Sequence, residues 1–176
     1  LQHPENTKYA YLMLRHSAQT LLAPQEYDLK DFIMPVDEDV RGSFAESVQT
    51  LQGLVFILDD NIELAKQQFQ SVLEKTDNPM SKTISQLYLL QIALMEGDNK
   101  KAEEYASIRG VKSFLSIKTA DMQVIQAWYQ FKVKKDVVQT HKAMKIARQK
   151  MNSSRMLRDE KSYYQNWLAE LEEELV

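Results

Sequence analysis

Apolar residues recur at spacings of three and four along nearly the whole chain, and no stretch of four or more residues alternates like a β-strand. Because this spacing gathers apolar side chains on one face of a helix, it predicts helices throughout. Between Pro24 and Gly42 we expect an acidic, mobile connector with one short turn at 28–33. The expected helices cover residues 7–23, 43–58, 62–75, 81–96, 100–109, 118–134, 137–151 and 159–175.

Short polar turns divide these helices into pairs. Asn61, Asp98 and Asp136 are typical N-cap residues, and each stands between a longer first helix and a shorter second one. They lie 37 and 38 residues apart. Gly97 suits the left-handed conformation that ends a helix, and we expect Gly110 to close the next helix in the same way. Helix pairs at such a period are typical of solenoids, whereas a four-helix bundle does not require them.

In the segment Ser47–Pro79, the first helix has a small residue at Gly53 and an aromatic one a turn later at Phe56, while the second helix has a small residue at Ala65 and a bulky one at Phe69. With this pattern the segment resembles a tetratricopeptide repeat. Small residues let the two helix axes approach to the usual 8–10 Å. The second pair keeps Gly97 and Ala102, and the third keeps Phe131 but has Thr140 where alanine is usual.

The resemblance implies an all-α fold, a right-handed array of antiparallel helix hairpins with a C-terminal capping helix. Residues 1–41 would form an N-terminal helix and the acidic connector, and residues 159–176 the amphipathic cap. Residues 42–158 would form three helix pairs, at 42–79, 80–115 and 116–158.

Such an array has a concave surface lined by the first helix of each pair, which implies a protein or peptide partner. The groove is mostly apolar, and Lys132 alone suits the family's carboxylate clamp, so we expect a hydrophobic peptide or helix instead of an acidic tail. Alternatively, the protein's own N-terminal helix fills the groove. The residues expected to line it are Thr50, Leu54, Ile57, Leu58, Leu87, Gln91, Leu94, Met95, Ile125, Tyr129 and Lys132.

Charge is unevenly distributed, although the net charge is only −3. Residues 25–63 are strongly acidic and residues 132–161 strongly basic. Lys142, Lys145 and Arg148 form a basic patch that could follow nucleic-acid phosphates. A solvated helix face explains the same pattern, so nucleic-acid binding is the less favoured alternative.

Motifs of catalysis and cofactor binding are missing from the sequence. It has no cysteine, no glycine-rich phosphate loop, no His-Glu-x-x-His and no Gly-x-Ser-x-Gly. Asp37–Gly42 begins like a calcium loop, but Arg41 takes a ligand position and Val48 stands where the bidentate glutamate belongs. We therefore expect a non-catalytic protein without cofactor or metal.

The longest apolar run, Leu54–Leu58, is far shorter than the ~20 residues that cross a bilayer. We expect a cytoplasmic interaction scaffold. Because the sequence begins with Leu1 instead of methionine, a second hypothesis is that it is the sensor or oligomerisation part of a larger, transcriptional regulator. Self-association into a homo-oligomer is compatible with either hypothesis.

Overall fold

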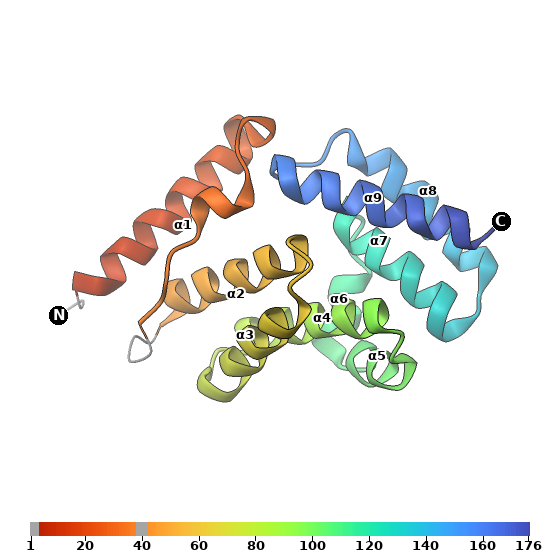
Figure 1. Cartoon of the computed structure of the whole chain (residues 1–176), viewed down its shortest axis with the longest axis horizontal. Coiled ribbons are helices and arrows are strands. Elements are labelled where there is room, and N and C mark those ends of the chain that lie inside the picture. Colours follow the sequence, from red (N-terminus) through yellow and green to blue (C-terminus); the bar gives the residue numbers. More distant parts are fainter. Residues whose placement is uncertain (1–3, 38–41) are drawn as a thin grey trace. The chain divides into compact units, whose positions relative to one another are not determined.

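The computed structural model of the chain describes residues 4–37 and 42–176. In those ranges every regular element is helical and none is a strand (Figure 1), so the all-α prediction is confirmed. The elements are α1 (Pro4–Leu22), η1 (Pro24–Glu26), η2 (Leu29–Phe32), α2 (Ser43–Leu58), α3 (Ile62–Lys75), α4 (Pro79–Glu96), α5 (Asn99–Ala106), α6 (Arg109–Leu115), α7 (Ala120–Tyr129), η3 (Gln130–Lys134), α8 (Val137–Met151) and α9 (Arg158–Glu174).

The same turn joins α2 to α3, α4 to α5, and η3 to α8. In each case one residue has a left-handed backbone, with φ of 58° at Asp60, 72° at Gly97 and 55° at Lys135. The next residue begins the second helix as its N-cap. The side chains of Asp98 and Asp136 each accept a hydrogen bond from the backbone amide three residues later in the chain. Asn61 is also an N-cap residue, but its side chain makes no capping hydrogen bond. The predicted turn positions are therefore confirmed.

Backbone hydrogen bonds differ between these turns. The amide of Asn61 donates to the carbonyl of Phe56 (2.7 Å), and that of Asp98 donates to Ala93 (2.9 Å), five residues back in both cases. In the third turn the amide of Asp136 reaches six residues back, to Gln130 (3.0 Å). This wider turn includes η3, a single π-helical turn, which accommodates one residue more than an α turn.

Close packing between α2 and α3 depends on Gly53. A Cβ atom there would lie 2.6 Å from the ring of Phe69, which is fully buried. That ring also stacks on Tyr88, at a centroid distance of 5.2 Å. The expectation of a small residue at position 53 is confirmed, and the reason is a side chain on the opposing helix.

One sequence-based expectation about local structure is wrong. The helix expected at 100–109 ends at Ala106, and Gly110 lies inside the next helix, α6, instead of closing the previous one. In the connector after Pro24, for which we expect mobility, Leu29 and Phe32 are buried, while residues 38–41 lie outside the described part of the chain. The short turn predicted at 28–33 is present as η2.

The structure consists of two compact units. Unit 1 comprises residues 1–88 and 155–160, and unit 2 comprises residues 89–154 and 161–176. Helices α4 and α9 each contribute to both units. The parts are described separately below.

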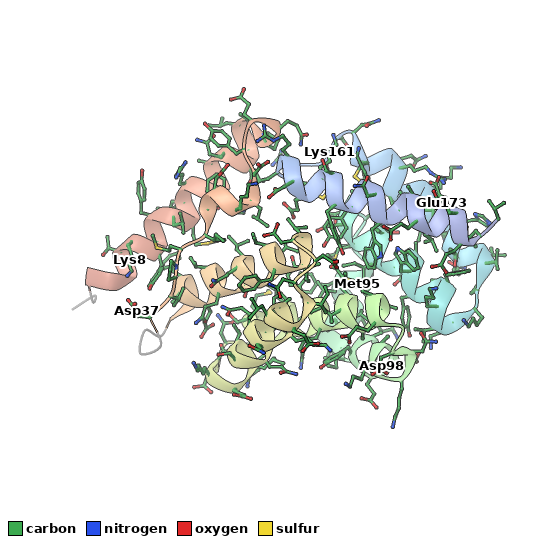
Figure 2. All side chains as sticks on the ribbon, in the orientation of Figure 1. Lys8, Asp37, Met95, Asp98, Lys161 and Glu173 are labelled. Carbon is green, nitrogen blue, oxygen red and sulfur yellow. The ribbon has the colours of Figure 1, made fainter. Side chains whose placement is uncertain are left out.

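In unit 1, α2 contacts α1, α3 and η2. Helix α1 buries Tyr9 and Leu12, and the Tyr9 hydroxyl accepts a hydrogen bond from the amide of Asp37 (3.2 Å). Lys8 and Asp37 form an ion pair at 3.2 Å, which links α1 to the end of the connector (Figure 2).

Residues 155–160 complete unit 1 by packing on the start of the connector. The amide of Arg158 donates to the carbonyl of Tyr27 (2.9 Å), and the amide of Leu29 donates to the Asp159 carboxylate (2.6 Å). The Arg158 guanidinium binds Asp28 at 2.8 Å. Leu157 between these contacts is fully buried.

In unit 2, α7 packs against α8, and α9 supplies a second layer of aromatic side chains. Trp128 and Trp167 stack with centroids 5.5 Å apart, and the Trp128 indole N–H donates to the carbonyl of Trp167 (3.0 Å). Tyr164, Leu168 and Leu171 are also buried. The apolar side predicted for the last helix is thus turned inward in this unit.

Candidate functional site

Most of the residues predicted to line an open groove lie in the interior. Eight of the eleven positions are buried in the part of the chain that the structure describes, and one of the eight, Tyr129, lines a cavity described below. Three- and four-residue spacing identifies an apolar helix face, but it does not tell whether another part of the chain covers that face. The eight buried residues are Thr50, Leu54, Ile57, Leu87, Gln91, Leu94, Ile125 and Tyr129.

Polar groups among these residues are bonded internally. The Tyr164 hydroxyl donates to Gln91 Oε1 at 3.0 Å, and the Tyr129 hydroxyl donates to Glu103 Oε2 at 3.0 Å. Thr50 donates to the backbone carbonyl of Glu46 (2.8 Å). Gln91 therefore ties α4 to α9 within unit 2 and offers nothing to a ligand.

The remaining three predicted groove residues are half-buried. Leu58 ends α2, and Met95 Sδ accepts a hydrogen bond from the Tyr163 hydroxyl at 3.3 Å. Lys132 forms an ion pair with Glu174 and lies over the Trp128 ring, 5.3 Å from its centroid. The structure brings Met95 and Lys132 to α9 side chains, not to a common open surface.

The predicted basic patch is exposed on α8. Lys142, Lys145 and Arg148 all face solvent. Arg148 is paired with Glu172 of α9, with 2.8 Å between Nε and Oε1. This pairing neutralises one of the three positive charges and leaves Lys142 and Lys145 as the accessible part of the patch.

A cavity of about 450 Å³ opens in unit 2 between α5, α6, α7 and η3. Its walls combine the apolar side chains of Ala106 and Leu115 with the charged ends of Glu103, Lys112 and Lys134. The sequence pattern does not predict this cavity, because its lining comes from four elements and the pattern does not indicate one of them, α6.

Three side chains on one wall of this cavity share hydrogen bonds. Glu103 accepts from the Tyr129 hydroxyl and from Lys134 Nζ (2.6 Å). Lys134 lowers the pKa of the Glu103 carboxyl, and Glu103 raises the pKa of Lys134. Burial raises the pKa of Tyr129, and Glu103 adds to that rise. Near neutral pH, Glu103 thus stays ionised, Lys134 stays protonated and Tyr129 stays neutral. Such a cluster is better suited to stabilising the local structure than to transferring a proton.

A second cavity, of about 170 Å³, lies beside the first, and the two share Leu115, Ser116 and Gln126. Lys118 and Lys142 lie on its wall. Gln126 Oε1 is buried and accepts no hydrogen bond from any residue that the structure describes. Of the predicted basic patch, Lys142 lines this second cavity, whereas Lys145 and Arg148 line neither of the two.

The surface of α1 in unit 1 carries an apolar face that the sequence analysis also missed. Tyr11, Leu14, Leu21 and Leu22 are 68, 66, 58 and 81% exposed, respectively. Together with the exposed Ala18 they follow helical spacing on one side of α1, while Tyr9 and Leu12 occupy the buried side. The sequence does contain the pattern for this face, because apolar residues fall on more than one side of α1.

No group of three or more His, Cys, Asp or Glu side chains within residues 4–37 and 42–176 could hold a metal ion. Residues 38–41 of the calcium-loop-like segment lie outside the described part of the chain. Among the described helices, none has the combination of length and apolar character required to cross a membrane. Comparisons with protein-family models, with curated proteins and with solved structures give no match.

Proposed function

We propose that this chain is a non-catalytic protein-interaction module that docks the exposed apolar face of α1 into a hydrophobic groove of a partner protein. The observation that carries the proposal is the set of large apolar side chains on one side of α1, each more than half exposed. Contiguous apolar surface of this kind is typical of interaction sites. Helices that bind in grooves present anchors at the spacing of Leu14, Ala18, Leu21 and Leu22.

The size of this face favours a groove over a symmetric dimer. With about 200 Å² for a large apolar side chain, the four exposed residues offer roughly 500 Å². A stable interface buries about 800 Å² on each partner. A groove that surrounds the helix would also bury the flanks of α1, whereas a flat contact with a second copy would bury the apolar face alone.

The charge around the face also favours an apolar partner surface. Arg15 is the charged residue next to the face, and its guanidinium lies over the Phe32 ring at 5.1 Å from the centroid. Lys8, one turn before Tyr11, is paired with Asp37. Little charge therefore has to be removed from water when the face is covered.

We further propose that the hairpins α2–α3, α4–α5 and α7–α8 are tetratricopeptide-like repeats in a scaffold. The equivalent turns at Asp60, Gly97 and Lys135 and the close approach at Gly53 support this reading. In such a scaffold the buried first helices hold the array together, and the exposed α1 face supplies the docking surface.

Tagged full-length chain, applied to an extract of the organism that produces it, tests the proposal. We expect the wild type to retain a defined protein that Leu14→Asp plus Leu22→Asp loses and that Gln67→Asp plus Gln70→Asp, at exposed positions of α3, retains. A synthetic peptide of residues 4–22 should compete with the purified partner. Circular dichroism should show equal helix content in all three chains, because the changed side chains are exposed.

Two results would contradict the proposal. Retention that is unaffected by the Leu14 and Leu22 substitutions would remove α1 as the docking surface. Sedimentation as a dimer that the same substitutions abolish would assign the face to self-association instead.

A further inference from the structure

Residues 155–160, which we call the clasp segment, are bound by unit 1 through their backbone. Gln25 Nε2 donates to the carbonyl of Met156 at 3.0 Å, and the amide of Arg158 donates to the carbonyl of Tyr27 at 2.9 Å. Residues 155–157 have no regular secondary structure. Short peptides are held on protein surfaces in the same way, by main-chain hydrogen bonds that do not depend on the identity of the side chains.

Three consecutive side chains of the clasp segment give this contact its sequence preference. Leu157 is fully buried and is the apolar anchor. The guanidinium of Arg158 contacts the Asp28 carboxylate at 2.8 Å, and the Asp28 side chain is only 15% exposed. The Asp159 carboxylate accepts a hydrogen bond from the amide of Leu29 at 2.6 Å. This surface of unit 1 thus favours leucine, then arginine, then an acidic residue.

The chain on both sides of the clasp segment belongs to unit 2. Residues 89–154 of that unit precede the segment, and residues 161–176 follow it. Asn152 and Ser153, just before it, are exposed residues of a turn. The clasp segment supplies the first turn of α9 but no residue of α1, α2 or α3, so its release is a local opening that leaves those three helices wound.

We propose that this surface of unit 1 is a peptide-binding site, which the clasp segment occupies as an internal ligand and from which a partner polypeptide containing Leu-Arg-Asp or Leu-Arg-Glu displaces it. The bound segment defines the chemistry of the ligand: an apolar anchor, a guanidinium for Asp28 and a carboxylate for the amide of Leu29. A tethered segment competes at an effective concentration in the range of about millimolar, so the internal ligand keeps the site closed to weak peptides. The site is distinct from the exposed α1 face.

Hydrogen exchange in the unmodified full chain tests the opening. The amides of Leu29 and Arg158 are bonded across the contact, whereas Phe69 is fully buried within α3. After correction for intrinsic rates, the first two amides should exchange at similar rates and at least about tenfold faster than that of Phe69, because local opening requires less free energy than global unfolding. Equal protection of all three would overturn the proposal, since the clasp segment would then leave only when the chain unfolds.

Peptide binding is measured by fluorescence anisotropy with a fluorescein-labelled peptide of residues 155–161 and blocked ends. The full chain carrying Leu157→Ser plus Arg158→Ser has a weakened internal ligand. This weakened chain should bind the peptide saturably and at least about tenfold more tightly than the wild type does. Circular dichroism checks that the weakened chain keeps its helices.

Charge reversal at Asp28 tests whether the site recognises arginine. Adding Asp28→Arg to the weakened chain should lower its affinity for the peptide by about tenfold or more, and a peptide with aspartate in place of Arg158 should restore the affinity. Asp77→Arg, at an exposed position of the same unit, reverses the same charge and should change the affinity less than about twofold.

Three further results would overturn the proposal. Equal weakening by Asp28→Arg and Asp77→Arg would show diffuse attraction to an acidic unit, and the absence of saturable binding to the folded weakened chain would remove the site. Sedimentation of the wild type as a dimer that Asp28→Arg abolishes would make the occupant the clasp segment of a second copy. Adding Leu14→Asp plus Leu22→Asp to the weakened chain should leave peptide affinity unchanged, so failure of the α1 proposal and failure of this one can be told apart.

Discussion

The ring of Phe69 lies 2.6 Å from the position that a Cβ atom on Gly53 would occupy. This distance is shorter than a carbon–carbon contact, and the ring has little room to move because it is buried and stacked on Tyr88. The crossing of α2 and α3 therefore requires glycine at position 53, although glycine lowers helix stability by about 1 kcal/mol relative to alanine.

Gly53→Ala should therefore destabilise unit 1 by about 1–3 kcal/mol, since overpacking outweighs the gain in helix propensity. Urea unfolding followed by circular dichroism measures the change. In a Phe69→Leu background, where the ring is gone, the same substitution should cost clearly less. Equal costs in the two backgrounds would show that Phe69 does not determine the choice of glycine.

The π-helical turn η3 should tolerate the loss of one residue. Deleting Val133 should convert η3 to an α turn, with a loss of unfolding free energy within about 1 kcal/mol. Deleting Gln139 from the regular helix α8 should cost more than about 3 kcal/mol, because every later side chain of that helix then turns away from its neighbours. Thermal unfolding of both deletions compares them, and equal losses would contradict the greater tolerance expected of the π-helical turn.

His16 should make stability depend on pH near neutrality. Burial lowers its pKa, and its ring packs edge-on against Phe32 at a centroid distance of 5.4 Å. The unfolded chain therefore takes up a proton first, so stability is full above about pH 6.5 and falls as the pH drops from there toward the lower pKa of the folded state. In the His16→Gln variant, the midpoint of thermal unfolding should change less between pH 7 and pH 5 than in the wild type. The His141→Gln variant, changed at an exposed position, should keep the wild-type dependence on pH.

Asp28 should add a second pH dependence at lower pH. Its hydrogen bond to Arg158 lowers the pKa of the Asp28 carboxyl, so the folded chain favours the ionised form. That stabilisation is complete above the ordinary aspartate pKa of about 3.9 and is lost as the pH falls through the folded value. Asp28→Asn should reduce the melting temperature at pH 6 and reduce its further decline below pH 4. Asp77→Asn, at an exposed position, serves as the control, and identical curves for the two variants would contradict a role of the Arg158 contact.

Helix boundaries were predictable wherever the chain carries strong local signals. The bounds of α2, α3 and α8 agree with those expected from the caps at Asn61 and Asp136 and from the break before Pro79. Gly110 was misleading because glycine is tolerated inside a short helix, and no local signal separates α5 from α6. The intervals of 37 and 38 residues between the turns are similar, but they contain different helices: α3 and α4 in the first, and α5, α6, α7 and η3 in the second.

The candidate sites could not be predicted in the same way, because exposure depends on distant parts of the chain. Leu54 and Leu14 both belong to apolar helix faces, yet the first is buried and the second is exposed. The cavity around Gln126 is formed by α5 to α8 together, and its unpaired oxygen becomes recognisable only when every neighbouring donor is known.

The position of residues 155–160 in unit 1 has a consequence for synthesis on the ribosome. Helices α1 to α3 emerge before these contacts can form, because the backbone partners of Tyr27 and Leu29 are supplied by Arg158 and Asp159, and Asp159 lies 130 residues after Leu29. A nascent chain that has reached the end of α8 still lacks them, and Leu157 is not yet there to fill its place in the core. Unit 1 therefore cannot be finished until residues 155–160 have been synthesised, and a stop after α8 would leave it open for a chaperone or a protease.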